Sequence, residues 1–195
     1  MKLLNLSEDR AWPTATAALA QIQQGQLLPS QLLESTLARL EQREPAVKAW
    51  THLAITAARQ QAAKQDQQLR DRSIGIWLKE QPLYGIPIAI KDIFATVDMP
   101  TAWGFPPYAG CFLNEEAAVI TRLRRAGAII LGKTVTTELA TATAGPTRNP
   151  HNLNHTPGGS SSGSAAAVAD GMVPISIGSQ TMGSSYWKAT HSTAN

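Results

Sequence analysis

Apolar positions recur at helical spacing through the first third of the chain. The leucines in residues 32–40 share one helix face, which predicts a helix with Ser30 as its N-cap. Pro45 should end this helix, because the residue before a proline is pushed out of the helical region. Residues 53–71, rich in alanine and polar side chains, predict a second helix with one solvated face. Residues 13–72 are therefore expected to be mostly helical and to buttress the rest of the chain.

The remainder of the chain alternates short apolar runs with helical segments. Residues 85–90, 128–132 and 173–177 are apolar and mostly rich in β-branched side chains, which is typical of buried strands. Residues 117–126 return to helical spacing, residues 162–170 are alanine-rich, and a glycine directly follows each segment. This rhythm of helix, tight turn and apolar strand predicts an α/β fold, with a β-sheet flanked by helices.

Candidate chemistry lies where the predicted strands end. Lys91 comes directly after the strand at residues 85–90, and Gly/Ser-rich loops occupy residues 157–164 and 178–185. Burial lowers the pKa of a lysine, so a buried lysine can be neutral and accept a proton. A serine is a weak nucleophile without a nearby base, and a lysine can supply that base. Consecutive backbone N–H groups in residues 181–184 could hold a developing oxyanion.

Composition narrows the class of protein. The chain has 195 residues, of which 43% are hydrophobic and 16% charged, as in one globular domain. The formal net charge is +3 and the basic residues form no run, so we expect no direct nucleic-acid partner. Cys111 is the single cysteine, which excludes an internal disulfide. The N-terminus lacks a signal-peptide core, and no apolar run reaches the about 20 residues that span a bilayer, so we expect a cytoplasmic protein without a membrane partner.

Two long motifs resemble the amidase signature family. They are YGIPIAIKDIF and TPGGSSSGSAAAVADGMVPISIGSQTMGSS, and GPTRNPHN before the second motif is also similar to family sequence. The resemblance runs from about Leu32 to Ser184, and its motifs are long, ordered and correctly spaced. It implies an amidase signature fold with a mixed β-sheet core flanked by helices. The expected parts of this single domain are an N-terminal helical segment (1–75), an α/β catalytic core (76–185) and an atypical tail (186–195).

The resemblance also implies a catalytic triad. Lys91 matches the family's general base, Ser160 the bridging serine that follows a cis peptide bond, and Ser184, 24 positions later, the nucleophile. The implied reaction is hydrolysis of a carbon–nitrogen bond in a linear amide through an acyl-enzyme intermediate, with no cofactor and no metal. The residues that match the oxyanion hole are Thr181, Met182, Gly183 and Ser184. The residues that match supporting positions are Ser161, Gly158 and Gly159.

Other interpretations of these positions stay open. Lys91 could be a surface lysine paired with Asp92, although the two downstream motifs favour the catalytic role. Residues 157–164 could be a linker or a phosphate cradle, but they lack the G-K-[ST] ending of a P-loop. Ser161 and Ser162 either hydrogen-bond Lys91 or cap the helix that comes next.

Two histidines have a spacing that could bind a metal. His151 and His155 are four residues apart, but they lie among Asn and Pro with no third ligand nearby. We therefore interpret them as polar loop residues.

The chain departs from the family pattern near its end. Gln180 stands where the family often has Asp, and Met182 where it often has Gly. After Ser184 the family continues with I-R-x-P-A, and only Ala189 fits that pattern here. The end therefore looks like a truncation or a frameshifted tail. We expect the chain alone to be poorly stable or inactive, because the sheet would keep an exposed edge.

The sequence leaves three functions open. The first is a general amidase acting on a small-molecule amide, which the segment ATATAGPTRNPHN favours. The second is the glutaminase subunit of the tRNA-dependent amidotransferase, which works with partner subunits. The third is a non-catalytic remnant that serves only as a folding or interaction module. A homodimer and a complex with amidotransferase partner subunits are both compatible with the sequence, which does not identify the amide.

Overall fold

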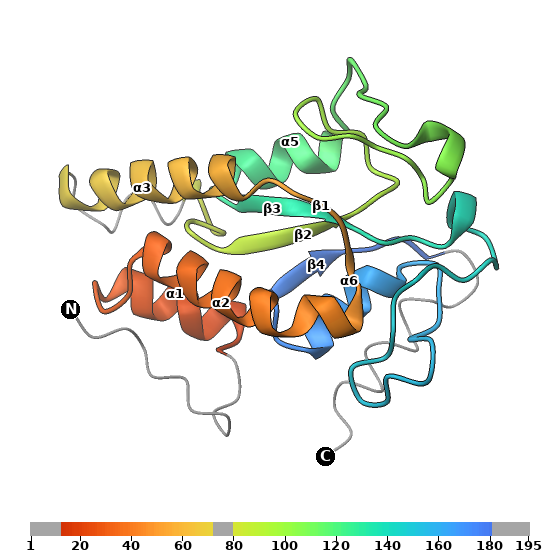
Figure 1. The fold of residues 1–195 in the computed structure, drawn as a ribbon. Coiled ribbons are helices and arrows are strands. Elements are labelled where there is room, and N and C mark those ends of the chain that lie inside the picture. The colour runs from red at the N-terminus through yellow and green to blue at the C-terminus, as the bar shows by residue number, and fades with distance from the viewer. Residues whose placement is uncertain (1–12, 72–79, 181–195) are drawn as a thin grey trace.

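Within the described part of the chain, four short strands form one mixed sheet in the order β1-β3-β2-β4 (Figure 1). The computed structural model describes residues 13–71 and 80–180. Strand β2 runs parallel to both β3 and β4, whereas β1 pairs antiparallel with β3. The three predicted strands are thereby confirmed, with ends shifted by at most two residues. The strands are β1 (Trp50–Leu53), β2 (Pro87–Lys91), β3 (Ile129–Thr134) and β4 (Ile175–Ile177).

Five α-helices and two 3-10 turns surround this sheet within the described residues. In Figure 1 the sheet lies between α5 on one side and α2 and α6 on the other. None of the helices in residues 13–71 and 80–180 is long and apolar enough to cross a bilayer. The helices are α1 (Ala15–Gln23), α2 (Pro29–Val47), α3 (Ile55–Asp71), α5 (Ala118–Arg125) and α6 (Ser162–Ala169), and the 3-10 turns are η1 (Pro106–Tyr108) and η2 (Glu138–Ala140).

The two central strands are buried on both faces, as parallel strands covered by helices usually are. Ile88 and Ile90 of β2 join one apolar cluster, together with Ile120 of α5. Ala89, on the opposite face of β2, joins a second cluster with Leu33 of α2. All side chains of β2 and β3 are buried, including one lysine in each strand. This double covering explains why the strands are continuous apolar runs rather than alternating ones.

Helix α2 differs from the prediction at both ends. Its N-cap is Leu28, with a proline in the first turn, so the predicted N-cap at Ser30 was wrong. Ser30 instead donates its backbone N–H to the Asp66 carboxylate of α3. The helix also continues through Pro45 to Val47, so that proline does not end it. Pro45 lies in the last turn of α2, so its missing backbone N–H affects only the end of the helix.

Strand β1 was not predicted, because its residues fell within the segment expected to be helical. Its four residues are too few to show a period of two, and its partner β3 lies about eighty residues further on. Gly132 of β3 permits the close approach, because a Cβ there would lie 2.2 Å from the carbonyl oxygen of His52. The N-terminal segment is thus not purely helical, and it contributes an edge strand to the sheet.

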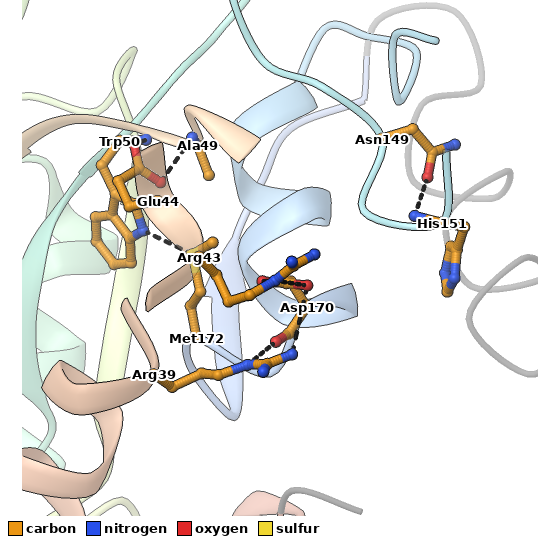
Figure 2. Close-up of polar contacts among 9 residues, drawn as sticks. All are labelled: Arg39, Arg43, Glu44, Ala49, Trp50, Asn149, His151, Asp170 and Met172. Atoms are coloured by element: carbon orange, nitrogen blue, oxygen red, sulfur yellow. Dashed lines mark hydrogen bonds and ion pairs between the residues drawn. The ribbon is translucent and has the colours of Figure 1, made fainter. Parts of the chain in front are cut away.

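A cluster of charges ties α2 to the C-terminal end of α6 (Figure 2). Arg39 donates to the Asp170 carbonyl at 2.8 Å, and the Arg43 guanidinium donates to the Asp170 carboxylate at 2.9 Å. Asp170 is the C-cap of α6, and its side chain is only 5% exposed. The Trp50 indole N–H also reaches the Met172 sulfur at 3.4 Å. The helical N-terminal segment therefore supports α6, whose opposite end carries the Gly/Ser-rich loop.

Candidate functional site

Lys91 is the last residue of β2, and its side chain is fully buried. Its Nζ donates to Ser160 Oγ at 2.6 Å and to Ser179 Oγ at 2.8 Å. Burial lowers the pKa of Lys91 to about 8. The interpretation of Lys91 as a surface lysine paired with Asp92 is therefore wrong, and the lysine is placed to exchange a proton with a serine hydroxyl.

Ser160 lies in the loop that leads into α6, and it is 3% exposed. The Gly159–Ser160 peptide bond is cis, as the family resemblance implies. The Ser160 carbonyl accepts the Thr137 backbone N–H at 2.9 Å. Gly159 packs on the same residue, because a Cβ there would lie 2.6 Å from the Thr137 methyl group. Gly158 adopts φ +80, which favours glycine. Thr137 thus contacts the loop at both Gly159 and Ser160, next to the Ser160 hydroxyl.

The hydroxyls of Ser161 and Ser162 bond to neighbouring loops rather than cap α6. Ser161 is the N-cap residue of α6 but makes no capping hydrogen bond with its side chain. Its hydroxyl instead donates to the Ser179 carbonyl at 2.9 Å and accepts the Ser179 N–H at 3.1 Å. The Ser162 hydroxyl donates to the Val135 carbonyl at 3.4 Å. Ser161 therefore fixes the residue whose hydroxyl accepts from Lys91.

Ser179 was not identified from the sequence. The sequence predicted a Gly/Ser loop at residues 178–185, which contains Ser179, but nothing in the pattern distinguished this residue from the rest of the loop. The structure brings Ser179 to Lys91 because β4 pairs with β2, so both strands end at the same edge of the sheet.

A second buried lysine lies next to the site and was also missed. Lys133 of β3 is fully buried, and its Nζ lies 3.0 Å from Asp92 Oδ1. Burial lowers the pKa of Lys133, and the Asp92 carboxylate opposes that shift. Burial likewise raises the pKa of Asp92, and Lys133 opposes it. Asp92 is therefore the partner of Lys133 and not of Lys91.

A cavity of about 220 Å³ opens beside Ser160. Its wall combines hydroxyl groups with small side chains and glycines, so it offers hydrogen bonds without large obstructions. The lining residues are Thr137, Thr141, Ala142, Ala144, Thr156, Gly158, Gly159 and Ser160.

Part of the predicted site lies outside the described residues. The predicted nucleophile Ser184 and the predicted oxyanion-hole residues Thr181, Met182 and Gly183 fall in the range 181–195, and their roles stay predictions. Gln180, the last described residue before them, is exposed.

The two histidines are exposed loop residues. The His151 backbone N–H donates to the Asn149 side chain at 2.9 Å, a contact visible in Figure 2. The His155 carbonyl accepts the Asn149 N–H at 2.8 Å. Within residues 13–71 and 80–180, no three His, Cys, Asp or Glu side chains gather as a metal site would require.

Known proteins are similar to this chain in sequence. Residues 31–185 match the protein family described as Amidase. The chain is 40% identical over 177 residues to the A subunit of the glutamyl-tRNA(Gln) amidotransferase of Rhodopirellula baltica, covering 88% of this chain and 34% of that protein. It is 39% identical over 184 residues to the putative amidase AmiA2 of Mycobacterium tuberculosis strain H37Rv, covering 91% of this chain and 37% of the relative.

Solved structures of amide-hydrolysing enzymes are also similar to this chain. The native peptide amidase from Stenotrophomonas maltophilia superposes with a TM-score of 0.77 at 34% identity, covering 89% of this chain and 37% of that one. A fatty acid amide hydrolase superposes with a TM-score of 0.80 at 27% identity, covering 92% and 32%. The chain thus spans about a third of the length of the relatives that it matches.

Proposed function

Because this chain belongs to the amidase signature family, we propose that it hydrolyses an amide bond with Lys91, Ser160 and Ser184 as its catalytic triad. The observation that carries this proposal is the contact between the buried Lys91 ammonium group and Ser160 Oγ at 2.6 Å. A lysine with a pKa of about 8 is partly neutral near physiological pH, as a general base must be. Lys91 is therefore suited to remove a proton from the Ser160 hydroxyl.

The proposed reaction is acyl transfer to a serine. Neutral Lys91 accepts the proton of Ser160, and Ser160 accepts the proton of Ser184 as the Ser184 oxygen bonds to the amide carbonyl carbon. When the tetrahedral intermediate collapses, the C–N bond breaks and the relay returns a proton to the leaving amine. Water then attacks the Ser184 ester by the same relay, which releases the acid and restores the serine.

Neighbouring groups support this chemistry. The backbone N–H groups of residues 181–184 are proposed to stabilise the oxyanion. Gly158 shapes the loop that presents Ser160 through its positive φ, and Gly159 and Ser161 do so through their contacts with Thr137 and Ser179. The cavity beside Ser160 is the proposed place of the amide substrate, because its wall includes the Ser160 hydroxyl and further hydroxyl donors. No cofactor or metal is needed for these steps.

Covalent labelling tests the assignment. A fluorophosphonate probe should modify Ser184, and peptide mass spectrometry should locate the adduct there. Ser184→Ala should lose the label, and Ser185→Ala, its sequence neighbour, should keep it. Unchanged labelling of Ser184→Ala would reject the nucleophile, and absence of labelling in a folded wild-type sample would favour the non-catalytic alternative.

A second candidate function is that of an amidotransferase glutaminase subunit. It is favoured by the 40% identity to the A subunit of a glutamyl-tRNA(Gln) amidotransferase. The 39% identity to a putative amidase is nearly the same, so identity does not separate the two functions. Ammonia release from glutamine that requires added partner subunits would support the glutaminase. Hydrolysis of small amides without partners would support the general amidase.

A further inference from the structure

Asp92 directly follows Lys91 in the chain and forms a buried ion pair with Lys133. This pair takes no part in the proposed acyl transfer. A buried pair is costly unless its remaining polar atoms are also satisfied. Lys133 Nζ meets this condition by donating to Thr101 Oγ1 at 2.7 Å and to the Pro100 carbonyl at 3.1 Å. The lysine thus joins the end of β2 to the segment of residues 100–104.

Asp92 holds the same segment through its backbone and its side chain. Its carboxylate accepts the Ala102 N–H at 3.2 Å, and its carbonyl accepts the Trp103 N–H at 3.0 Å. Trp103 has φ +53, a conformation that bulky side chains disfavour. The next residue, Gly104, lies directly on the loop after β3, because a Cβ there would lie 2.8 Å from the Thr136 carbonyl oxygen.

From Trp103 the contacts continue to the cavity wall. The Trp103 carbonyl accepts the Leu139 N–H at 2.8 Å. Leu139 and Ala140 have φ +47 and +58, and two consecutive non-glycine residues in this region persist only where their surroundings hold them. They connect Thr137 to Thr141, and both threonines line the cavity beside Ser160.

We propose that Asp92 and Lys133 are positioning residues that fix residues 100–104 and, through the Trp103 carbonyl, the Leu139–Ala140 backbone that shapes the cavity. The inference rests on the proposed function, because it takes the cavity to be the binding site of the amide substrate. It assigns to the pair an effect on substrate binding, because the pair acts on the wall and not on the proton relay.

Hydrogen exchange of the full chain, followed by mass spectrometry, tests the connection without any substrate. The variant is Asp92→Asn with Lys133→Met, which removes both charges together. Amide exchange in residues 137–142 should become faster, on the order of tenfold, as expected for a weakened hydrogen bond. Asp66→Asn is the control, because Asp66 is also buried but bonds to Ser30 of α2. Unchanged protection of residues 137–142 in the folded double variant would overturn the proposal.

A milder variant keeps the test decisive if the double variant does not fold. Thr101→Val removes one acceptor of Lys133 and preserves the volume of the side chain. Thr147→Val is its control, because Thr147 is also buried and donates to the Lys48 carbonyl in another part of the chain. Faster exchange in residues 137–142 for Thr101→Val alone supports the proposal. Equal exchange in the two variants contradicts it.

Kinetics distinguish positioning from a general structural effect. With an amide substrate, the double variant should show a KM raised severalfold, while kcat and the pH of half-maximal turnover stay unchanged. A lower kcat at unchanged KM would contradict an effect on substrate binding. If the wild-type chain neither hydrolyses amides nor reacts with the probe, the proposed function fails, and the exchange experiment still decides whether the pair holds the wall.

Discussion

Two buried lysines, Lys91 on β2 and Lys133 on β3, are equally inaccessible to solvent, but their partners differ in charge. Both side chains are fully buried on neighbouring strands, and burial lowers the pKa of each. Lys133 faces the carboxylate of Asp92, which favours its charged form. Among the described residues, the hydrogen-bond partners of the Lys91 ammonium group are two serine hydroxyls, which carry no charge.

This difference shows how one residue type supports two roles in one sheet. A carboxylate partner keeps a buried lysine charged and turns it into a fixed element of the structure. Hydroxyl partners offset less of the cost of burying the charge than a carboxylate does, so the neutral base becomes accessible near physiological pH. The partner of the lysine, and not its burial, therefore separates the proposed base from the positioning residue.

The largest expected effect comes from removing the proposed base. Lys91→Met should lower kcat/KM by about 10²–10⁴-fold, the usual contribution of a general base. The free energy of unfolding should not fall, because no buried charge loses a partner. Steady-state kinetics and thermal unfolding measure the two quantities. Turnover that survives this change would remove Lys91 from the mechanism.

The matching change on the other strand should affect stability instead. Lys133→Met leaves the Asp92 carboxylate buried without its partner, which should cost about 3–5 kcal/mol of unfolding free energy. Denaturant unfolding measures this loss. Adding Asp92→Asn should recover much of it, and the absence of any recovery would show that the ion pair is not what the single variant breaks.

The third prediction concerns pH. Turnover should rise as pH increases through about 8, because Lys91 must be neutral to accept a proton. Its folded pKa lies below the ordinary value of 10.5, so the unfolded chain binds more protons between these values. Stability should therefore also rise from about pH 8 to 10.5, by about 3 kcal/mol. Comparing unfolding of the wild type and Lys91→Met across this range isolates the contribution, and identical pH slopes would refute it.

The smallest effect is expected at Ser179. Ser179→Ala removes one acceptor of the Lys91 ammonium group, which should lower kcat/KM by at most about tenfold. The midpoint of the pH–rate profile should move to lower pH, because that hydrogen bond favours charged Lys91. Ser176→Ala is the control, since the Ser176 hydroxyl bonds to the Ala89 carbonyl within the sheet. Equal profiles for both variants would argue against a role of Ser179.

Local pattern predicted much of the fold. The apolar runs identified β2, β3 and β4, the helical spacing identified α2 and α5, and the alanine-rich composition identified α3 and α6. Strand β1 escaped because four residues show no clear period, and the ends of α2 were wrong because Ser30 and Pro45 were judged by local preference alone. The three-part division of the domain stays a prediction.

The sequence by itself determined the family and the identity of the proposed base and bridging serine, because long motifs place Lys91 and Ser160 at defined positions. It could not supply the partners of the two lysines. Asp92 is adjacent to Lys91 in the chain but pairs with Lys133, and Ser179 reaches Lys91 from 88 residues away. Side chains alternate between the two faces of a sheet, so neighbours in sequence point apart, and strand pairing decides which distant groups meet. Only the tertiary structure therefore separated the lysine held by a carboxylate from the lysine that two hydroxyls surround.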